Sequence, residues 1–131
     1  MMRLKNKYSL VLGSILHIIA GVIGATSCKH DPDLSNTPTI SYSNDVQPIL
    51  IANCTQSGCH GNVYNEGFKL LSYNDVLRHI KPGSATGSQL NKVITAYGNI
   101  ETQMPPPPNR HLNDQEVSTI YLWILQGAKN N

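Results

Sequence analysis

The sequence has little charge and no surplus of either sign beyond its first residues. Only 14% of the 131 residues are charged, and three of the ten Lys and Arg precede residue 10. From Cys28 onward, seven Lys and Arg stand against eight Asp and Glu, a net charge of −1. This balance provides no basic face for nucleic acid, and no nucleic-acid-binding motif is present. The length predicts a single domain.

The sequence also lacks a clean apolar run long enough to span a bilayer. Residues 10–23 are apolar but are interrupted by His17, whereas a spanning helix needs about 20 such residues. A short apolar run that follows a basic start and ends in small residues is typical of an export signal. We therefore predict that residues 1–27 are a signal peptide, with an uncleaved N-terminal anchor as the alternative.

Cysteine is scarce, and three in one chain is an odd number for an exported protein. The first, Cys28, follows Ala25-Thr26-Ser27, and this stretch resembles the lipidation box of bacterial lipoproteins. The resemblance implies lipidation of Cys28 and an anchor on a bacterial membrane, at its periplasmic side or at the cell surface. A free or intermolecular thiol is the alternative. Residues 28–42 are polar with two prolines, so we expect a flexible tether.

The other two cysteines lie close together and are followed at once by a histidine, as Cys54, Cys59 and His60. This order is needed for haem c, in which two thiols add to the porphyrin vinyl groups and the imidazole binds iron. Four residues separate the two cysteines instead of the usual two, so the loop should bulge outward. Gly58 permits a positive φ there, and Gly61 removes bulk after the histidine. The alternatives are a disulfide, and a zinc site for which no cysteine remains as fourth ligand.

Strand signals are weak, and apolar residues recur mainly at helical spacing. We therefore predict an all-α fold, a small helical domain over residues 43–131. Ser43 or Asn44 is expected to cap its first helix, and Pro48 requires that this helix begin close by. The proline run 105–108 excludes a helix and favours a rigid extended segment. The predicted helices cover residues 44–54, 72–80, 88–96 and 113–127.

The acidic residues that a catalytic site would need are accounted for by helix caps. Asn113 and Glu116 form a capping box at the start of the last predicted helix, in which Asp114 also lies, and Gly127 is suited to its end. In the helix predicted for residues 72–80, Asp75 follows Ser72 by three residues and so occupies the position that Glu116 has in the last helix. General acid–base catalysis therefore has little support, and we do not expect an enzyme.

Several stretches, taken in order, resemble the class I cytochrome c superfamily, and most closely the planctomycete-type cytochrome c domain. They are residues 45–50, the cysteine pair with His60-Gly61, Met104-Pro105-Pro106 and residues 123–128. The resemblance extends over about residues 43–129 and implies one covalent haem packed between an N-terminal and a C-terminal helix. It also implies His60 as the proximal and Met104 as the distal iron ligand.

The expected function is single-electron transfer between redox proteins, because a haem with both axial positions filled by protein has no open site for substrate. We expect a monomer. His79 and His111 are the alternatives to Met104 as distal ligand, and Arg110 is a candidate partner for a haem propionate. Two other functions stay open: a peroxidase-like haem enzyme with an open distal site, and a haem-free structural or binding lipoprotein closed by a disulfide.

Overall fold

The computed structural model describes residues 32–63 and 67–131. The chain divides into two compact units, Met1–Asp33 and Leu34–Asn131, and every described helix belongs to the second. The predicted signal peptide and Cys28 lie outside the described residues. The described part consists of helices and loops without a strand, as the sequence predicts.

The first helical segment begins with a π-helical turn, η1 (Tyr42–Val46), and continues directly into α2 (Gln47–Cys54). Pro48 is the second residue of α2, but the π-helical turn runs directly into α2, so the helical segment as a whole begins at Tyr42 and not close to Pro48. Val46 and Leu50 are buried in the core, whereas Ile51 is exposed.

The N-cap of this segment is Ser41, whose side-chain oxygen accepts a hydrogen bond from the N–H of Asn44 at 3.2 Å. The prediction of a cap at Ser43 or Asn44 was therefore wrong, because the π-helical turn starts the segment earlier. Ser43 instead donates its hydroxyl to the main-chain oxygen of Asn131 at 2.9 Å.

Two short helices follow, α3 (Tyr73–Leu77) and α4 (Gln89–Ile94). The capping box predicted at the start of α3 is confirmed, because Ser72 and Asp75 each accept the other's backbone N–H. Both helices end earlier than predicted. After α3 the chain tightens into turns with bonds three residues apart and then meets Pro82, which cannot continue a helix.

The last helix, α5 (Asp114–Leu125), begins and ends as the sequence predicts. Asn113 and Glu116 form the reciprocal capping box, with N–H to oxygen distances of 2.9 and 2.8 Å. Gly127 has a φ of +93°, and the N–H groups of Gly127 and Ala128 bond back to the last turn of α5. This pattern is a Schellman motif, which satisfies carbonyl groups that the end of the helix would leave unpaired.

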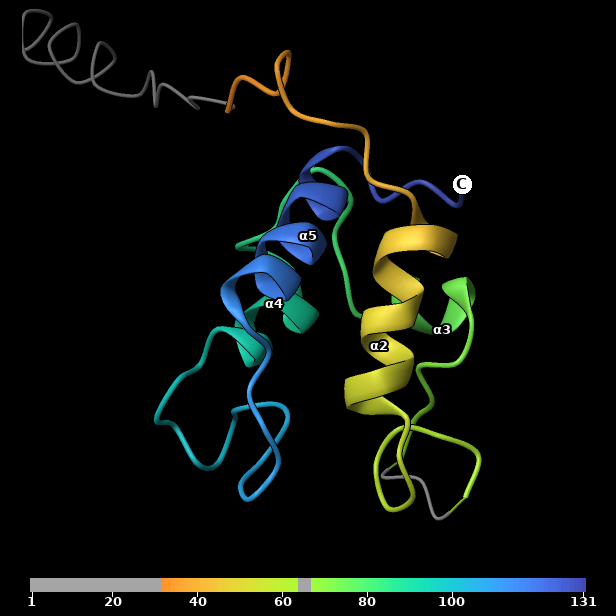
Figure 1. Cartoon of the computed structure of the whole chain (residues 1–131), viewed down its shortest axis with the longest axis vertical. Coiled ribbons are helices and arrows are strands. Elements are labelled where there is room, and N and C mark those ends of the chain that lie inside the picture. The colour runs from red at the N-terminus through yellow and green to blue at the C-terminus, as the bar shows by residue number, and fades with distance from the viewer. Residues whose placement is uncertain (1–31, 64–66) are drawn as a thin grey trace, which may run out of the picture. The chain divides into compact units, whose positions relative to one another are not determined.

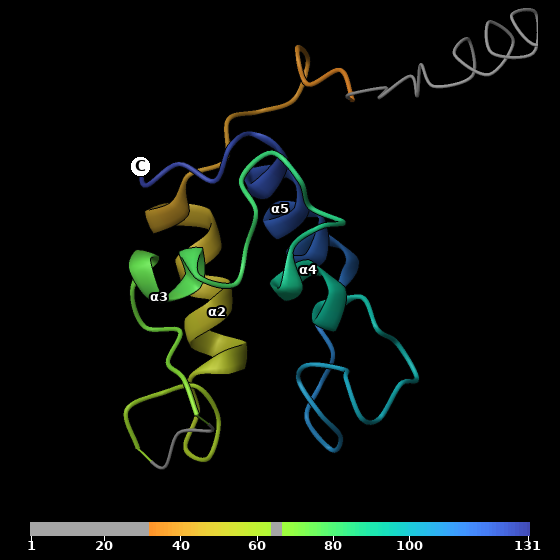
Figure 2. The same ribbon diagram turned by 180° about the vertical axis from the view of Figure 1, so that it is seen from behind.

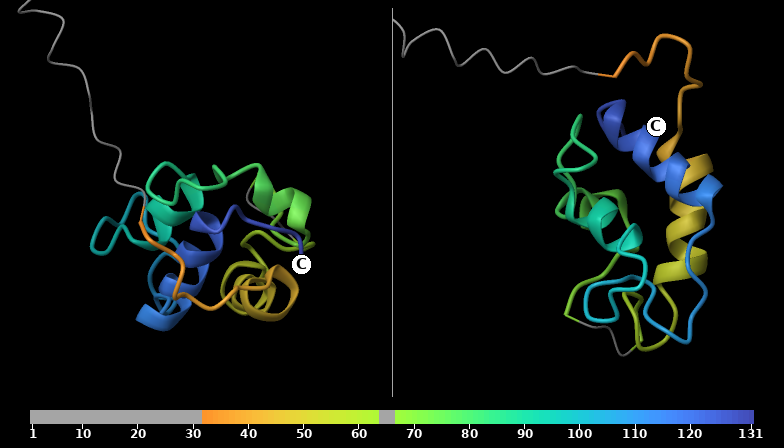
Figure 3. Two further views of the ribbon diagram at one scale, coloured as in Figure 1. Left: turned by 90° about the horizontal axis from the view of Figure 1, so that it is seen from above. Right: turned by 90° about the vertical axis from the view of Figure 1, so that its left-hand side faces the viewer.

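The core is built around α5, which contacts η1 on one side and α4 on the other (Figure 3). Trp123 is fully buried, and its ring lies 5.4 Å from the ring of Tyr42, which in turn meets Tyr73 edge-on at 5.3 Å. This aromatic cluster lies where η1 begins and α5 ends. The loop that follows α2 and the loop that precedes α5 both lie at the opposite end of the domain (Figures 1 and 2).

The last residues of the predicted tether are bonded to α5. The side-chain amide of Gln126 accepts the N–H of Ile40 at 2.9 Å and donates to the carbonyl oxygen of Pro38 at 2.7 Å. Tyr42 belongs to the core. The compact unit therefore begins at Leu34, before the boundary predicted at residue 43.

The proline run is not the extended segment predicted for it. The peptide bonds Met104–Pro105 and Pro107–Pro108 are cis, and the N–H of Asn109 closes a turn onto the carbonyl oxygen of Pro106 at 3.0 Å. An extended segment does not form such a turn, so the chain bends back on itself here instead. The exclusion of a helix here is confirmed.

Candidate haem-attachment site

The loop that carries the cysteine pair starts from a packed helix and folds back on that helix. Cys54 is the last residue of α2 and is buried. The N–H of Cys59 donates to the carbonyl oxygen of Gln56 at 3.0 Å, and the N–H of His60 donates to the carbonyl oxygen of Cys54 at 2.8 Å. These bonds bring the imidazole back beside the end of α2 despite the four-residue spacer.

Two glycines permit this fold-back, and both behave as the sequence predicts. Gly58 has a φ of +83°, a conformation that residues with a Cβ rarely adopt. Gly61 packs so closely against Thr55 that a Cβ there would overlap the Thr55 carbonyl oxygen. The turn at Gly58 and the close approach of Gly61 to Thr55 therefore both depend on the absence of a side chain.

The structure brings all four predicted haem-binding residues to one place. Cys54, Cys59, His60 and Met104 line a cavity of about 90 Å³. Three of them, all except Cys59, also line an adjoining cavity of about 200 Å³. The walls of the larger cavity are otherwise mostly apolar and come from the loop after α2, the turn after α3, and α4: Phe68, Leu70, His79, Gln89, Leu90, Val93 and Ile94.

The His60 ring is held by one hydrogen bond and one stacking contact. Its Nδ1 lies 3.2 Å from the carbonyl oxygen of Phe68, and the two rings stack with centroids 4.2 Å apart. A carbonyl oxygen only accepts, so Nδ1 carries the proton and Nε2 presents its lone pair. This is the arrangement by which proteins orient a histidine for a metal ion.

Met104 reaches the cavities from the loop that precedes α5. Its N–H donates to the carbonyl oxygen of Val93, in α4, at 3.0 Å. This hydrogen bond ties the backbone of Met104 to α4. Met104 and His60, the predicted axial ligands, line both cavities together.

The other candidate histidines are placed differently. His79 lines the larger cavity, but the Phe68 ring stacks between His79 and His60, with a centroid distance of 4.1 Å to His79. Burial, followed by the neighbouring His60, lowers the pKa of His79. His111 lines neither cavity and packs edge-on against Tyr97 at 5.4 Å.

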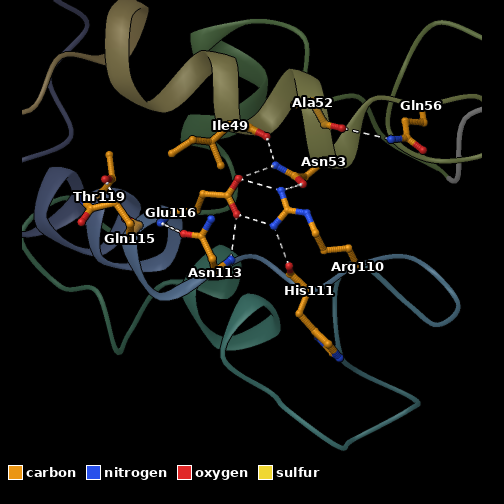
Figure 4. A network of polar contacts seen from close by, with 10 residues as sticks. All are labelled: Ile49, Ala52, Asn53, Gln56, Arg110, His111, Asn113, Gln115, Glu116 and Thr119. Carbon is orange, nitrogen blue, oxygen red and sulfur yellow. Dashed lines mark hydrogen bonds and ion pairs between the residues drawn. The ribbon is translucent and has the colours of Figure 1, made fainter.

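Arg110 belongs to a polar network that joins three segments (Figure 4). Its guanidinium donates to both carboxylate oxygens of Glu116 at 2.8 and 2.9 Å, and to the side-chain oxygen of Asn53 at 3.0 Å. It also donates to the carbonyl oxygen of His111. The Arg110 pairing lowers the pKa of Glu116 to about 2. Arg110 therefore links the Met104 loop to α2 and to the capping box of α5, a role that the sequence did not reveal.

A basic hollow adjoins the larger cavity. It measures about 310 Å³, shares His79 and Gln89 with that cavity, and is rimmed by Arg78, Lys81 and Lys92. In the part of the chain that the structure describes, none of these three cations makes a salt bridge. The hollow therefore suits a carboxylate at the rim of an apolar site.

The state of the cysteine pair bears on the disulfide and zinc alternatives. Cys54 and Cys59 are both free thiols. Burial raises the pKa of the Cys54 thiol to about 12, with Cys59 as the second cause, so this thiol stays protonated at neutral pH and is effectively apolar. For zinc, no three His, Cys, Asp or Glu side chains converge to hold a metal ion anywhere in residues 32–63 and 67–131.

Sequence reasoning missed three residues that support the site. Phe68 orients His60, Asn53 receives Arg110, and Gln103 is buried next to Met104. Asn53 acts through a contact with a residue distant in the sequence, whereas Phe68 and Gln103 act through contacts within their own loops. No sequence motif identifies any of these contacts. The one available signal was for Asn53, which directly precedes the first cysteine of the pair.

No helix within the described ranges has the length and apolar character needed to cross a membrane. Comparison with known proteins finds no family model, curated protein or solved structure that matches this chain.

Proposed function

We propose that the protein is a membrane-anchored, monohaem c-type cytochrome that passes single electrons between redox proteins. The observation that carries this proposal is the convergence of Cys54, Cys59, His60 and Met104 on one cavity. Two thiols in one loop, an oriented imidazole and a thioether are the donor set of a c-type haem with His and Met ligands. The mostly apolar walls of the adjoining cavity fit the body of a porphyrin.

Each of the four residues has a distinct role in this proposal. Cys54 and Cys59 hold the haem covalently, because each thiol adds across one vinyl double bond and its hydrogen goes to the other vinyl carbon, without an oxidant. His60 offers Nε2 to the iron while Phe68 holds its other nitrogen. Met104 would hold the iron through its thioether and so leave no open coordination site for substrate or water. When bound, the haem supplies a one-electron couple whose potential depends on these ligands and their surroundings.

Met104 is a better distal ligand than either histidine. It shares both cavities with His60, whereas His111 shares neither. His79 is separated from His60 by the Phe68 ring, in one continuous stack. His79, in line with that stack, would be poorly placed to hold the same haem iron as His60.

The haem propionates are assigned to the basic hollow rather than to Arg110. Arg78, Lys81 and Lys92 would hold the propionates, which a porphyrin carries on pyrrole rings other than those that bear its vinyl groups. The hollow at Arg78, Lys81 and Lys92 joins the cavity through His79 and Gln89, which do not line the smaller cavity at the cysteines. Arg110 is already paired with Glu116 and Asn53.

The proposal is tested by whether haem is covalently attached to the protein. Expressed with a c-type maturation system, the protein should keep its haem through denaturing electrophoresis and through acid–acetone extraction. Cys59→Ala should leave a single thioether, and its pyridine haemochrome spectrum should shift to the red. Haem that leaves the wild-type chain on extraction would refute covalent attachment.

The same preparation distinguishes the other two functions. Rapid binding of carbon monoxide or cyanide to the iron would indicate an open distal site and a peroxidase-like enzyme. A purified protein with no Soret absorption and with Cys54 and Cys59 joined in a disulfide would indicate the haem-free structural lipoprotein.

A further inference from the structure

The loop between α4 and α5, which carries Met104, has little apolar interior of its own. Two of its larger hydrophobic residues, Tyr97 and Ile100, are exposed, whereas Leu112 is buried where the loop joins α5. Gln103 is also buried, with 3% of its surface exposed. A buried amide beside exposed hydrophobic residues requires an explanation, because polar groups are buried only where hydrogen bonds compensate for lost water.

Both ends of the Gln103 amide are used within the loop. Its oxygen accepts the N–H of Gly98 at 3.0 Å, and its nitrogen donates to the carbonyl oxygen of Pro105 at 3.2 Å. The backbone N–H of Gln103 also donates to the carbonyl oxygen of Asn99 at 2.8 Å. One side chain thus joins the part of the loop that leaves α4 to the carbonyl group of Pro105, the residue that follows Met104.

This bridge complements the single bond from Met104 to α4. The bond from the Met104 N–H to Val93 fixes one point of the backbone but leaves the following residues free to turn about it. The Gln103 amide fixes the carbonyl of Pro105, so the Met104 backbone is held on both sides. A methionine side chain has three rotatable bonds, and its sulfur stays in one place only if its backbone is preorganised.

We propose that Gln103 is a positioning residue that holds the side chain of Met104 at the cavities that it shares with His60, where it would bind the haem iron. This inference rests on the proposed haem function and on Met104 as the distal ligand. Gln103 touches neither iron nor porphyrin in this proposal. Its effect is on how readily the thioether leaves the iron when another ligand competes.

The test is competition by imidazole in the oxidised holoprotein. Gln103→Leu keeps a similar volume but leaves the Gly98 N–H and the Pro105 carbonyl unpaired. We expect the variant to bind imidazole at least about tenfold more tightly, which corresponds to about 1.4 kcal/mol. Its weak sulfur–iron charge-transfer band should lose intensity while the haem content and the thioether bonds stay unchanged. The control is Gln115→Leu, the same change at an exposed glutamine of α5, which should match the wild type.

If Gln103 had only a structural role, Gln103→Leu would lower the stability of the protein to urea without a selective change in its affinity for imidazole. If Gln103→Leu yields no folded holoprotein, Gln103→Asn serves instead, because its shorter amide reaches one of the two partners at most and should give a smaller gain. An imidazole affinity equal to that of the wild type in the folded variant would overturn the inference. A wild-type protein with haem but without the sulfur–iron band would also overturn it, because Met104 would not be the ligand. A wild-type protein without haem would instead overturn the proposed function itself.

Discussion

The ion pair between Arg110 and Glu116 gives the sharpest prediction about stability. Glu116→Gln removes the carboxylate charge and leaves a side chain that still accepts the N–H of Asn113, because glutamine also suits this position of a capping box. The substitution therefore isolates the charged interaction with Arg110 from the cap itself. It should destabilise the protein at neutral pH, and the loss should shrink in acid.

The magnitude follows from the pKa of Glu116, which falls from 4.5 to about 2 in the folded protein. At about 1.4 kcal/mol for each tenfold change, this shift alone corresponds to about 3 kcal/mol. The Arg110 side chain is 58% exposed and that of Glu116 18%, so solvent screening reduces the contribution to roughly 1–2 kcal/mol. Because the folded-state pKa is depressed, the contribution is complete above pH 4.5 and is lost as the pH falls towards 2.

The assay is urea unfolding of both proteins, followed by far-UV circular dichroism from pH 7 to pH 2. The matched control is Asp114→Asn, which removes a charge from the same first turn of α5 but has no ion-pair partner in the described part of the chain. We expect it to lose no more than about 0.5 kcal/mol, the usual effect of the helix dipole at an exposed site. Equal losses in the two variants, or a Glu116→Gln loss that does not change with pH, would refute the reasoning.

Four further predictions test other parts of the molecule. Intact mass should show cleavage before Cys28 and added acyl chains, with the protein in the membrane fraction, whereas a mature form that keeps Met1 would contradict lipidation. Met104→Ala should abolish the sulfur–iron band, open the iron to cyanide and lower the reduction potential; survival of the band would exclude this ligand. Gly61→Ala places a methyl group against the Thr55 carbonyl and should cost roughly 1–3 kcal/mol in urea unfolding, and a neutral effect would mean that the loop does not approach α2 so closely. Lys81→Gln should lower the potential in a redox titration, because removing a cation near the propionates favours ferric iron, and an unchanged potential would argue against the basic hollow.

The features that the sequence predicted correctly are those decided within a few residues. The capping boxes at Ser72 and Asn113 follow from side chains that bond three positions away, and the turns at Gly58 and Gly127 follow from the conformations open to glycine. Pro48 lies in the first turn of α2, a position that the fixed φ and the missing N–H of a proline allow. The convergence of Met104 with the cysteine pair was expected from a resemblance, not from local rules.

The features that sequence reasoning missed depend on partners far along the chain. Residues 37–42 have the composition of a tether, yet Gln126 binds their backbone from the end of α5. The proline run was predicted to be straight, but it bends back within the loop where Gln103 bonds to Pro105. Nothing in the composition of either segment identifies these partners.

The attachment of residues 37–42 to the end of α5 has a mechanical consequence. Any pull on the chain from its N-terminal side reaches the domain first through the bonds of Gln126, beside the aromatic cluster, and not through the loops at the other end. The load therefore enters the domain beside the buried Tyr42 and Trp123 rings, and not at the loops that carry the cysteine pair and Met104. If the chain is anchored at Cys28, as proposed, those loops lie at the end of the domain away from its point of attachment.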